Sequence, residues 1–74
     1  MMGPKLINAA LTHFTAERER AEATLLAYCN NPVGVGGHPD LVGEVIKSIS
    51  EVTDAEERIK TCQSLLEQNK KKSK

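Results

Sequence analysis

The sequence has few aromatic residues and few residues that favour β-strands. Among its 74 residues it contains no tryptophan, one phenylalanine and one tyrosine. Proteins that bind single-stranded nucleic acid stack bases on aromatic side chains, and this chain has too few of them for such a platform. Apolar residues never alternate with polar ones over the length of a strand. The sequence therefore argues against a β-sheet and against a stacking surface for bases.

Cysteines, long apolar runs and metal-ligand motifs are equally scarce. Two cysteines and no recognisable signal peptide argue against a disulfide framework. No apolar run approaches the roughly 18 residues of a membrane span. The two cysteines and two histidines lack the spacing of a zinc site. We expect an intracellular chain with reduced thiols, without cofactor, metal or membrane span.

Ten basic residues balance ten acidic ones, but the two charges are unevenly placed. Four of the basic residues are Lys70, Lys71, Lys72 and Lys74, so the rest of the chain has six basic against ten acidic residues and a net charge of −4. The last five residues also lack apolar positions. They predict a basic, disordered tail over residues 70–74, attached to one domain over residues 1–69.

Apolar residues in the first half of the chain repeat with heptad spacing, which predicts a helix from about residue 4 to residue 30. Pro4 fits the first turn of this helix, and Pro32 prevents its continuation. Arg18 interrupts the stripe at its middle. The stripe consists of Ile7, Leu11, Phe14, Ala21, Leu25 and Tyr28.

A second and broader apolar stripe predicts a helix from about residue 39 to residue 68. Pro39 suits its first position, and Asp40 and Glu44 place negative charge near the positive end of the helix dipole. The stripe consists of Leu41, Val45, Ile49, Val52, Ala55, Ile59, Cys62 and Leu66, flanked by Val42, Ile46 and Leu65.

The stretch NNPVGVGGHPD, residues 30–40, separates the two helices. Its glycines allow the chain to reverse within about nine residues, which predicts an antiparallel hairpin. A phosphate-binding loop is the alternative, but Gly-Lys-Ser/Thr and a preceding strand are both missing. His38 is interpreted as an exposed turn residue rather than a helix cap, metal ligand or pH sensor. The candidate corner residues are Pro32, Gly34, Gly36, His38 and Pro39.

A chain that reverses near residue 35 brings together residues whose numbers add up to about 69 or 70. This register predicts four facing pairs: Phe14 with Ala55, Leu25 with Val45, Ala21 with Ile49, and Leu11 with Ile59. It also places Cys29 and Cys62 on the order of 30 Å apart, too far for a disulfide. We expect both thiols to be buried rather than reactive.

Two helices cover only part of each other's apolar stripes, so the hairpin needs a further partner. The fold expected is all-α: a coiled-coil-like hairpin that dimerises into a four-helix bundle or docks on a different protein. Arg18 is expected to pair with Glu51 across the hairpin or with an acidic residue of a second chain. The candidate interface residues are Phe14, Arg18, Val42, Ile46, Ile49, Ile59 and Leu66.

No residue set indicates catalysis. His13 and Glu17, four residues apart, could form half of a metal site, but a solvated pair is the simpler interpretation. No Ser, His and Asp have a spacing that favours nucleophilic chemistry, and a thin bundle offers no cleft from which water is excluded. We expect no enzymatic activity.

The corner resembles that of a group of short proteins from tailed bacteriophages of marine bacteria. Those proteins are helical and share an Asn-Pro-Val-Gly-Val-Gly-x-His-Pro corner followed by an acidic helix. Gly37 departs from an acidic residue associated with that position. The resemblance implies a viral origin and a location in the host cytoplasm or the virion, and it implies no activity. The matching residues are Asn31, Pro32, Val33, Gly34, Val35, Gly36, His38 and Pro39.

Two hypotheses for function follow. The first is a non-enzymatic hairpin that acts through protein association, as a homodimer, a minor phage component or a factor that binds a host protein. The alternative is a dimeric regulator that uses its basic tail to associate with nucleic acid. The acidic body opposes this alternative, since it repels phosphate over much of the surface.

Overall fold

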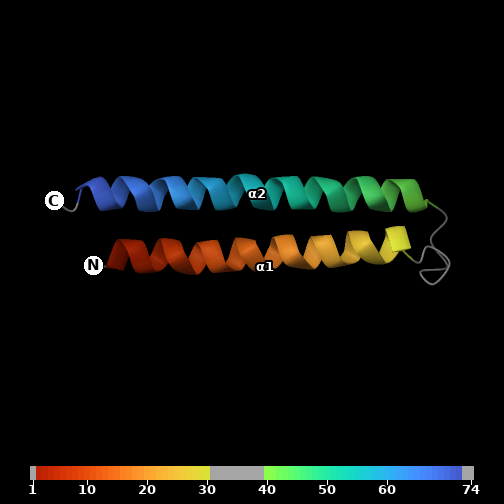
Figure 1. Ribbon diagram of the computed structural model, residues 1–74, viewed down its shortest axis with the longest axis horizontal. Helices are drawn as coiled ribbons and strands as arrows, with labels where there is room; N and C mark the ends of the chain where they lie inside the picture. Colours follow the sequence, from red (N-terminus) through yellow and green to blue (C-terminus); the bar gives the residue numbers. More distant parts are fainter. Residues whose placement is uncertain (1, 31–39, 73–74) are drawn as a thin grey trace.

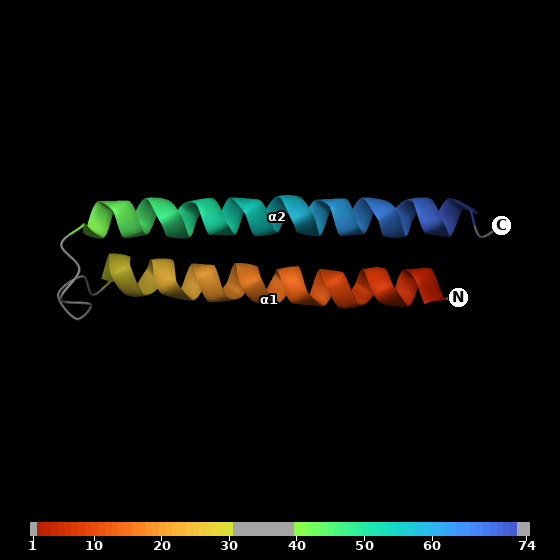
Figure 2. The ribbon, with the colours of Figure 1, turned by 180° about the vertical axis from the view of Figure 1, so that it is seen from behind.

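The computed structural model describes residues 2–30 and 40–72, with side chains for 3–30 and 40–70. Helix α1 spans Met2–Asn30 and helix α2 spans Leu41–Lys72. The two helices lie side by side and antiparallel (Figure 1), and the reverse view shows the same arrangement (Figure 2). The molecule measures 56 × 15 × 15 Å. The all-helical hairpin predicted from the sequence is confirmed. The corner residues Pro32, Gly34, Gly36, His38 and Pro39 lie outside the described residues.

The two ends of the hairpin differ. At the turn end, α1 ends and α2 begins; at the open end, α1 begins and α2 ends (Figure 1). Helix α1 starts two residues before Pro4, which still lies among the first four residues, whose N–H groups have no intrahelical acceptor. Helix α2 continues to Lys72, four residues beyond its expected end. Glutamine and lysine are good helix formers, and lysine is favourable near the negative end of the dipole.

Asp40 caps the start of α2. Its Oδ1 accepts a hydrogen bond from the Gly43 N–H at 2.9 Å, and its carbonyl accepts one from the Glu44 N–H at 3.2 Å. This is the geometry of an N-cap, which satisfies N–H groups that lack an acceptor within the helix. A β-carbon at position 43 would collide with the Asp40 carboxylate, which would have to shift from its capping position. The helix therefore begins after Asp40, two residues later than expected.

The contact between the helices follows a strict alternation of four-residue and three-residue steps on both helices. We call these positions the seam. In α1 the seam residues are Ile7, Leu11, Phe14, Arg18, Ala21, Leu25 and Tyr28, all buried or half-buried. In α2 they are Leu41, Val45, Ser48, Val52, Ala55, Ile59, Cys62, Leu66 and Asn69, also buried or half-buried. This spacing is typical of coiled-coil packing.

One seam position differs from the sequence prediction. Ser48 is 3% exposed, whereas Ile49 is 49% exposed. The expected pairing of Ala21 with Ile49 is therefore wrong. The seam advances by three residues from Val45 and by four to Val52, so helical geometry brings Ser48 inward although isoleucine is the more apolar residue. Spacing decides this position, and hydrophobicity does not.

Three contacts define the register of the hairpin. A β-carbon at Gly3 would lie 3.4 Å from Asn69 Nδ2, the Arg58 guanidinium lies 6.0 Å from the centroid of the Phe14 ring, and the Tyr28 hydroxyl lies 3.4 Å from Glu44 Oε1. The two residue numbers add up to 72 in every pair. The expected sum, 69 or 70, is close to this value. A residue of α1 and a residue of α2 therefore lie at the same level along the hairpin when their numbers add up to 72.

The core is thin. Its buried apolar residues are Ala21, Ala55, Ile59 and Cys62. Where the structure describes side chains, every large one is at least 2% exposed. The chain exposes 5668 Å² of surface, against about 4500 Å² for a compact monomer of 8.1 kDa. The hairpin alone therefore leaves more surface in water than a compact fold of this mass.

Candidate association surface

Within the part of the chain that the structure describes, four large apolar side chains are exposed near the turn end. Val42 is 70% exposed, Ile46 59% and Ile49 49%, while Leu26 on α1 is 58% exposed. Residues 42, 46 and 49 lie on one line along α2, because they are spaced by four and three residues. Leu26 and Ile46 have numbers that add up to 72, so they lie at the same level. We call these four residues the isoleucine patch.

All four patch residues lie on the same long side of the hairpin. Each directly follows a seam residue: Leu26 follows Leu25, and Val42, Ile46 and Ile49 follow seam positions of α2 in the same way. Successive residues are rotated by about 100° around a helix. Two antiparallel helices that face each other turn in opposite senses, so residues that follow the seam on either helix lie on one common side.

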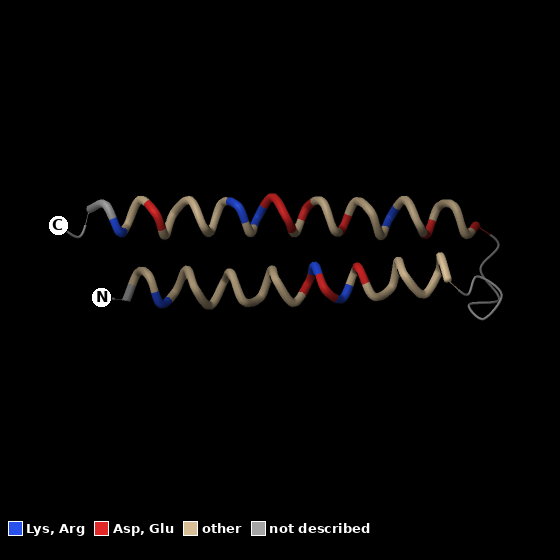
Figure 3. The backbone as a smooth tube through the Cα atoms, viewed as in Figure 1, with Lys and Arg blue, Asp and Glu red and all other residues tan. Residues whose placement is uncertain are grey.

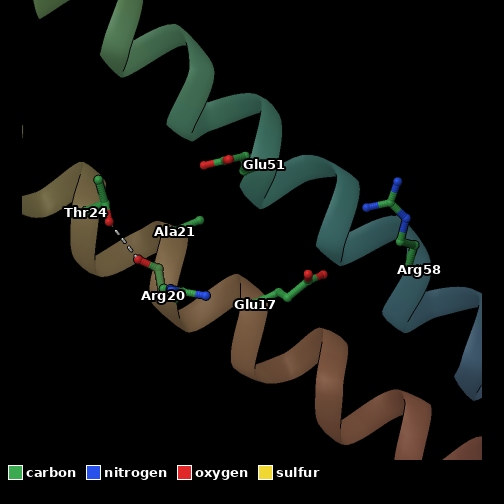
Figure 4. Close-up of a pocket in the computed structure, with 6 residues that line it drawn as sticks. All are labelled: Glu17, Arg20, Ala21, Thr24, Glu51 and Arg58. Atoms are coloured by element: carbon green, nitrogen blue, oxygen red, sulfur yellow. Dashed lines mark hydrogen bonds between the residues drawn. The ribbon is translucent and has the colours of Figure 1, made fainter.

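The opposite long side holds a groove of about 360 Å³, which we call the charged groove. It is lined by Glu17, Arg20, Ala21, Thr24, Glu51 and Arg58 (Figure 4). Except for Ala21, every one of these residues directly precedes a seam residue. The Thr24 hydroxyl donates a hydrogen bond to the Arg20 carbonyl at 3.1 Å within the helix. The two sides of the hairpin thus differ in chemistry as well as in position.

The charged groove lacks the features of a ligand pocket. Two carboxylates and two guanidinium groups line it together, so neither an anion nor a cation is favoured, and its apolar wall is a single alanine. Pockets for small molecules are mainly apolar, with few polar groups that fix orientation. The groove does not indicate a substrate.

Arg18 lies in the seam near the middle of α1 and is half-buried. Its Nε is buried and has no hydrogen-bond partner. Among the described residues no Lys or Arg lies in an ion pair, so the expected pairing of Arg18 with Glu51 is wrong. Glu51 lines the charged groove, and Arg18 does not. A buried N–H without a partner costs about 1–3 kcal/mol. Pairing of Arg18 with a second chain stays a prediction.

The remaining candidate interface residues divide into two groups. Val42, Ile46 and Ile49 lie together on the isoleucine patch. Phe14, Ile59 and Leu66 belong to the seam, where Ile59 is 6% exposed and packs inside the hairpin. Sequence reasoning missed Leu26 as part of the surface. The available signal was its position directly after Leu25, the same relation that Val42 has to Leu41.

Other candidate groups carry no site. His13 Nε2 lies 3.3 Å from Glu17 Oε2, with both side chains well exposed, so the pair is solvated as predicted. Cys62 is buried as predicted, but Cys29 is exposed, and both thiols are free. Within residues 2–30 and 40–72 no group of three His, Cys, Asp or Glu side chains could hold a metal ion.

Charge and hydropathy vary along the hairpin. Residues 6–16 of α1 contain no Lys, Arg, Asp or Glu, whereas α2 carries these residues along most of its length (Figure 3). Neither described helix has a stretch long and apolar enough to span a bilayer. Leu6 and Leu65, 64% and 44% exposed, both precede seam residues and form a smaller apolar spot at the open end, on the groove side.

Comparison of the chain with models of protein families, with curated proteins and with solved structures finds no match. Function is therefore inferred from the geometry of the hairpin.

Proposed function

We propose that this protein is a non-enzymatic helical hairpin that acts by protein association, and that its primary partner is a second copy of itself. Two hairpins would form a four-helix bundle. The observation that carries the proposal is the isoleucine patch: Leu26, Val42, Ile46 and Ile49 are about half exposed or more, whereas only four of the described residues are apolar and buried.

Energetics support this proposal. A lone core in a chain of this size supplies only about 3–5 kcal/mol of stability. Each large apolar side chain contributes about 1.5–3 kcal/mol when it moves from full exposure to full burial. Since the patch residues are already partly covered, each contributes less than this, but four from each copy still provide a gain comparable with the stability of the hairpin. Association and folding would therefore depend on each other.

The resemblance of the corner to phage proteins extends this proposal to a biological setting. In that setting the bundle would be a minor virion component or would bind a host protein in the cytoplasm. The alternative function, association with nucleic acid, draws support from the extension of α2 to Lys72, which continues the helix into the lysine-rich end. Gel retardation at increasing salt concentration distinguishes the two, because binding to phosphate weakens steeply with salt.

The concentration dependence of thermal unfolding tests the proposal. A dimer is stabilised by mass action, so its melting temperature rises with protein concentration, whereas that of a monomer does not. We expect the Tm from circular dichroism at 222 nm to rise by several degrees over a hundredfold increase in concentration. An unchanged Tm over that range would contradict self-association.

A further inference from the structure

The proposed function leaves the arrangement of the two copies open, and the surface chemistry of the hairpin selects one. We infer that two copies pack through the side that carries the isoleucine patch, with both turn ends at the same end of the bundle. A two-fold axis along the bundle then places α1 of one copy over α2 of the other. This inference rests on the proposed self-association and specifies its geometry.

Apolar residues meet apolar residues in this arrangement. The two-fold axis keeps the levels of the hairpin, so a residue of α1 faces the α2 residue of the partner subunit whose number completes the sum of 72. Leu26 therefore faces Ile46 of the partner subunit. Cys29, which is exposed, lies within one residue of the level of Val42 of the partner subunit. From the level of Leu26 to the turn end, the interface is therefore apolar on both sides.

Charges are compatible in the half nearest the open end. There Lys5, which follows Pro4 one seam step before Ile7, faces Glu67 of the partner subunit, so opposite charges attract. Lys60 of the partner subunit faces Thr12, and Glu19 faces Thr53 of the partner subunit. Like charges meet at none of these levels. Glu22 lies within one residue of the level of Ile49 of the partner subunit and one helical turn from Arg18 of its own helix.

Arg18 gains a partner in the same arrangement. Its level corresponds to residue 54 of α2, and Glu56 of the partner subunit lies two residues away, about 3 Å along the axis. Glu56 is exposed in the hairpin and follows the seam residue Ala55, which places it on the same side as the patch. Both side chains are long enough to bridge this offset. The buried Nε of Arg18, unpaired in the single hairpin, would then lie within reach of a carboxylate.

Antiparallel arrangements are less favourable. With full overlap, Ile46 would lie near the level of Glu67 of the partner subunit, and Glu56 would face its own copy. Overlap of the turn ends alone would pair Ile46 with itself, but it would leave most of each long side uncovered. One long side measures 56 × 15 Å, on the order of 800 Å², which matches the roughly 800 Å² per partner of a stable interface.

Disulfide trapping between chains that each carry one introduced, exposed cysteine tests the geometry. The full chain with Cys29→Ser is the parent; Cys62 stays in place because it is buried. Chains carrying Leu26→Cys and chains carrying Ile46→Cys are mixed in urea, refolded together under mild oxidation and resolved on a non-reducing gel. We expect the mixture to form at least five times more covalent dimer than either chain alone. The parent with only Cys29→Ser should form none.

The smaller apolar spot provides the matched control. Leu6→Cys and Leu65→Cys have nearly the same level relation, since their numbers add up to 71, but they lie on the groove side. Their mixture should form no covalent dimer above background. Efficient trapping of this control pair, or of Ile46→Cys alone, would overturn the inferred geometry.

Light scattering of the unmodified chain separates the two possible failures. A dimer that does not trap the 26–46 pair would overturn only the geometry. A monomer at all concentrations would remove the proposed self-association and the inferred geometry with it.

Discussion

The two long sides of the hairpin differ in how far their side chains contact the other helix. On the groove side, side chains bridge the helices: Arg58 lies over the Phe14 ring, and the Tyr28 hydroxyl donates to Glu44. On the other side, Ile46 and Leu26 lie at one level and both stay largely exposed. Polar and aromatic side chains thus connect the two helices on the groove side, whereas the patch side presents exposed apolar side chains. A surface of this kind is typical of a site of protein association.

A residue's side follows from its place relative to the seam. Residues directly before a seam position lie on the groove side, and residues directly after it lie on the patch side. Near the turn end the following residues are apolar, whereas Glu17 and Glu51 precede the seam and are charged. A shift of one position along the sequence therefore decides whether a side chain lies on the groove side or on the patch side.

The largest effect is expected from a change that damages both sides at once. Ile59→Ala removes a buried side chain from the seam, which typically costs about 2–5 kcal/mol. This cost is as large as the roughly 3–5 kcal/mol of stability that a core of this size supplies, so the folded state would no longer be favoured. We expect the variant to lose most of its helical circular dichroism at 25 °C and low micromolar concentration.

Ile49→Ala is the matched control for that variant, since it removes the same atoms from an exposed position. It should lose much less helix content at the same concentration, because it weakens self-association without leaving a cavity in the seam. Equal loss of helicity in the two variants would mean that Ile49, not Ser48, packs in the seam.

The next largest effect separates the two sides directly. Ile46→Glu places a charge in the centre of the isoleucine patch, so dimer formation would bury it without a partner. We expect the dissociation constant from sedimentation equilibrium to rise at least about 100-fold, which corresponds to about 2.7 kcal/mol. Leu65→Glu changes an apolar residue of similar exposure on the groove side and should alter the constant by no more than about threefold. Similar effects of both changes on the dissociation constant would contradict dimer formation through the patch side.

Charge exchange at Arg18 tests which acidic residue approaches it. Arg18→Glu should weaken the dimer about tenfold or more, since it replaces the expected attraction to Glu56 of the partner subunit by repulsion. The double variant Arg18→Glu with Glu56→Arg should restore most of the affinity. Arg18→Glu with Glu51→Arg is the control, because Glu51 lies on the groove side, and it should restore little. Rescue by Glu51→Arg instead of Glu56→Arg would show that Arg18 contacts Glu51 within one hairpin.

The smallest effect concerns the groove side alone. Burial raises the pKa of Tyr28 above its ordinary value, and the charge of Glu44 and its hydrogen bond raise the pKa further. The folded state therefore holds the phenolic proton more tightly than the unfolded state. This contribution is complete below the ordinary pKa of tyrosine, near 10, and is lost as pH rises through the raised value. Urea midpoints should fall more between pH 9 and pH 11 for the unmodified chain than for Tyr28→Phe. Parallel curves for the two proteins would show that Tyr28 titrates alike in the folded and unfolded states.

Local spacing was sufficient to predict the hairpin, because heptad repeats, prolines and glycines act over a few residues. Ile49 was misplaced because hydrophobicity was weighted above spacing, and Ser48 occupies the seam position instead. The missing pair between Arg18 and Glu51 has a related cause. Both residues are near the middle of the hairpin, but Glu51 precedes a seam position and lines the groove.

The association surface was predicted only in part. Val42, Ile46 and Ile49 were identified from the width of the second stripe, but Leu26 was not, since a single leucine beside a heptad stripe gives no periodic signal of its own. Its role emerges only when the register places it at the level of Ile46. The thiol of Cys29 is exposed for a similar reason: it directly follows the seam residue Tyr28.

Sedimentation equilibrium of the unmodified chain tests the central claim, self-association of the hairpin, most directly. At tens of micromolar and physiological salt, the account predicts a mass of twice the 8.1 kDa of one chain, falling toward the monomer on dilution. A mass of one chain at every concentration, with full helical circular dichroism, would contradict it.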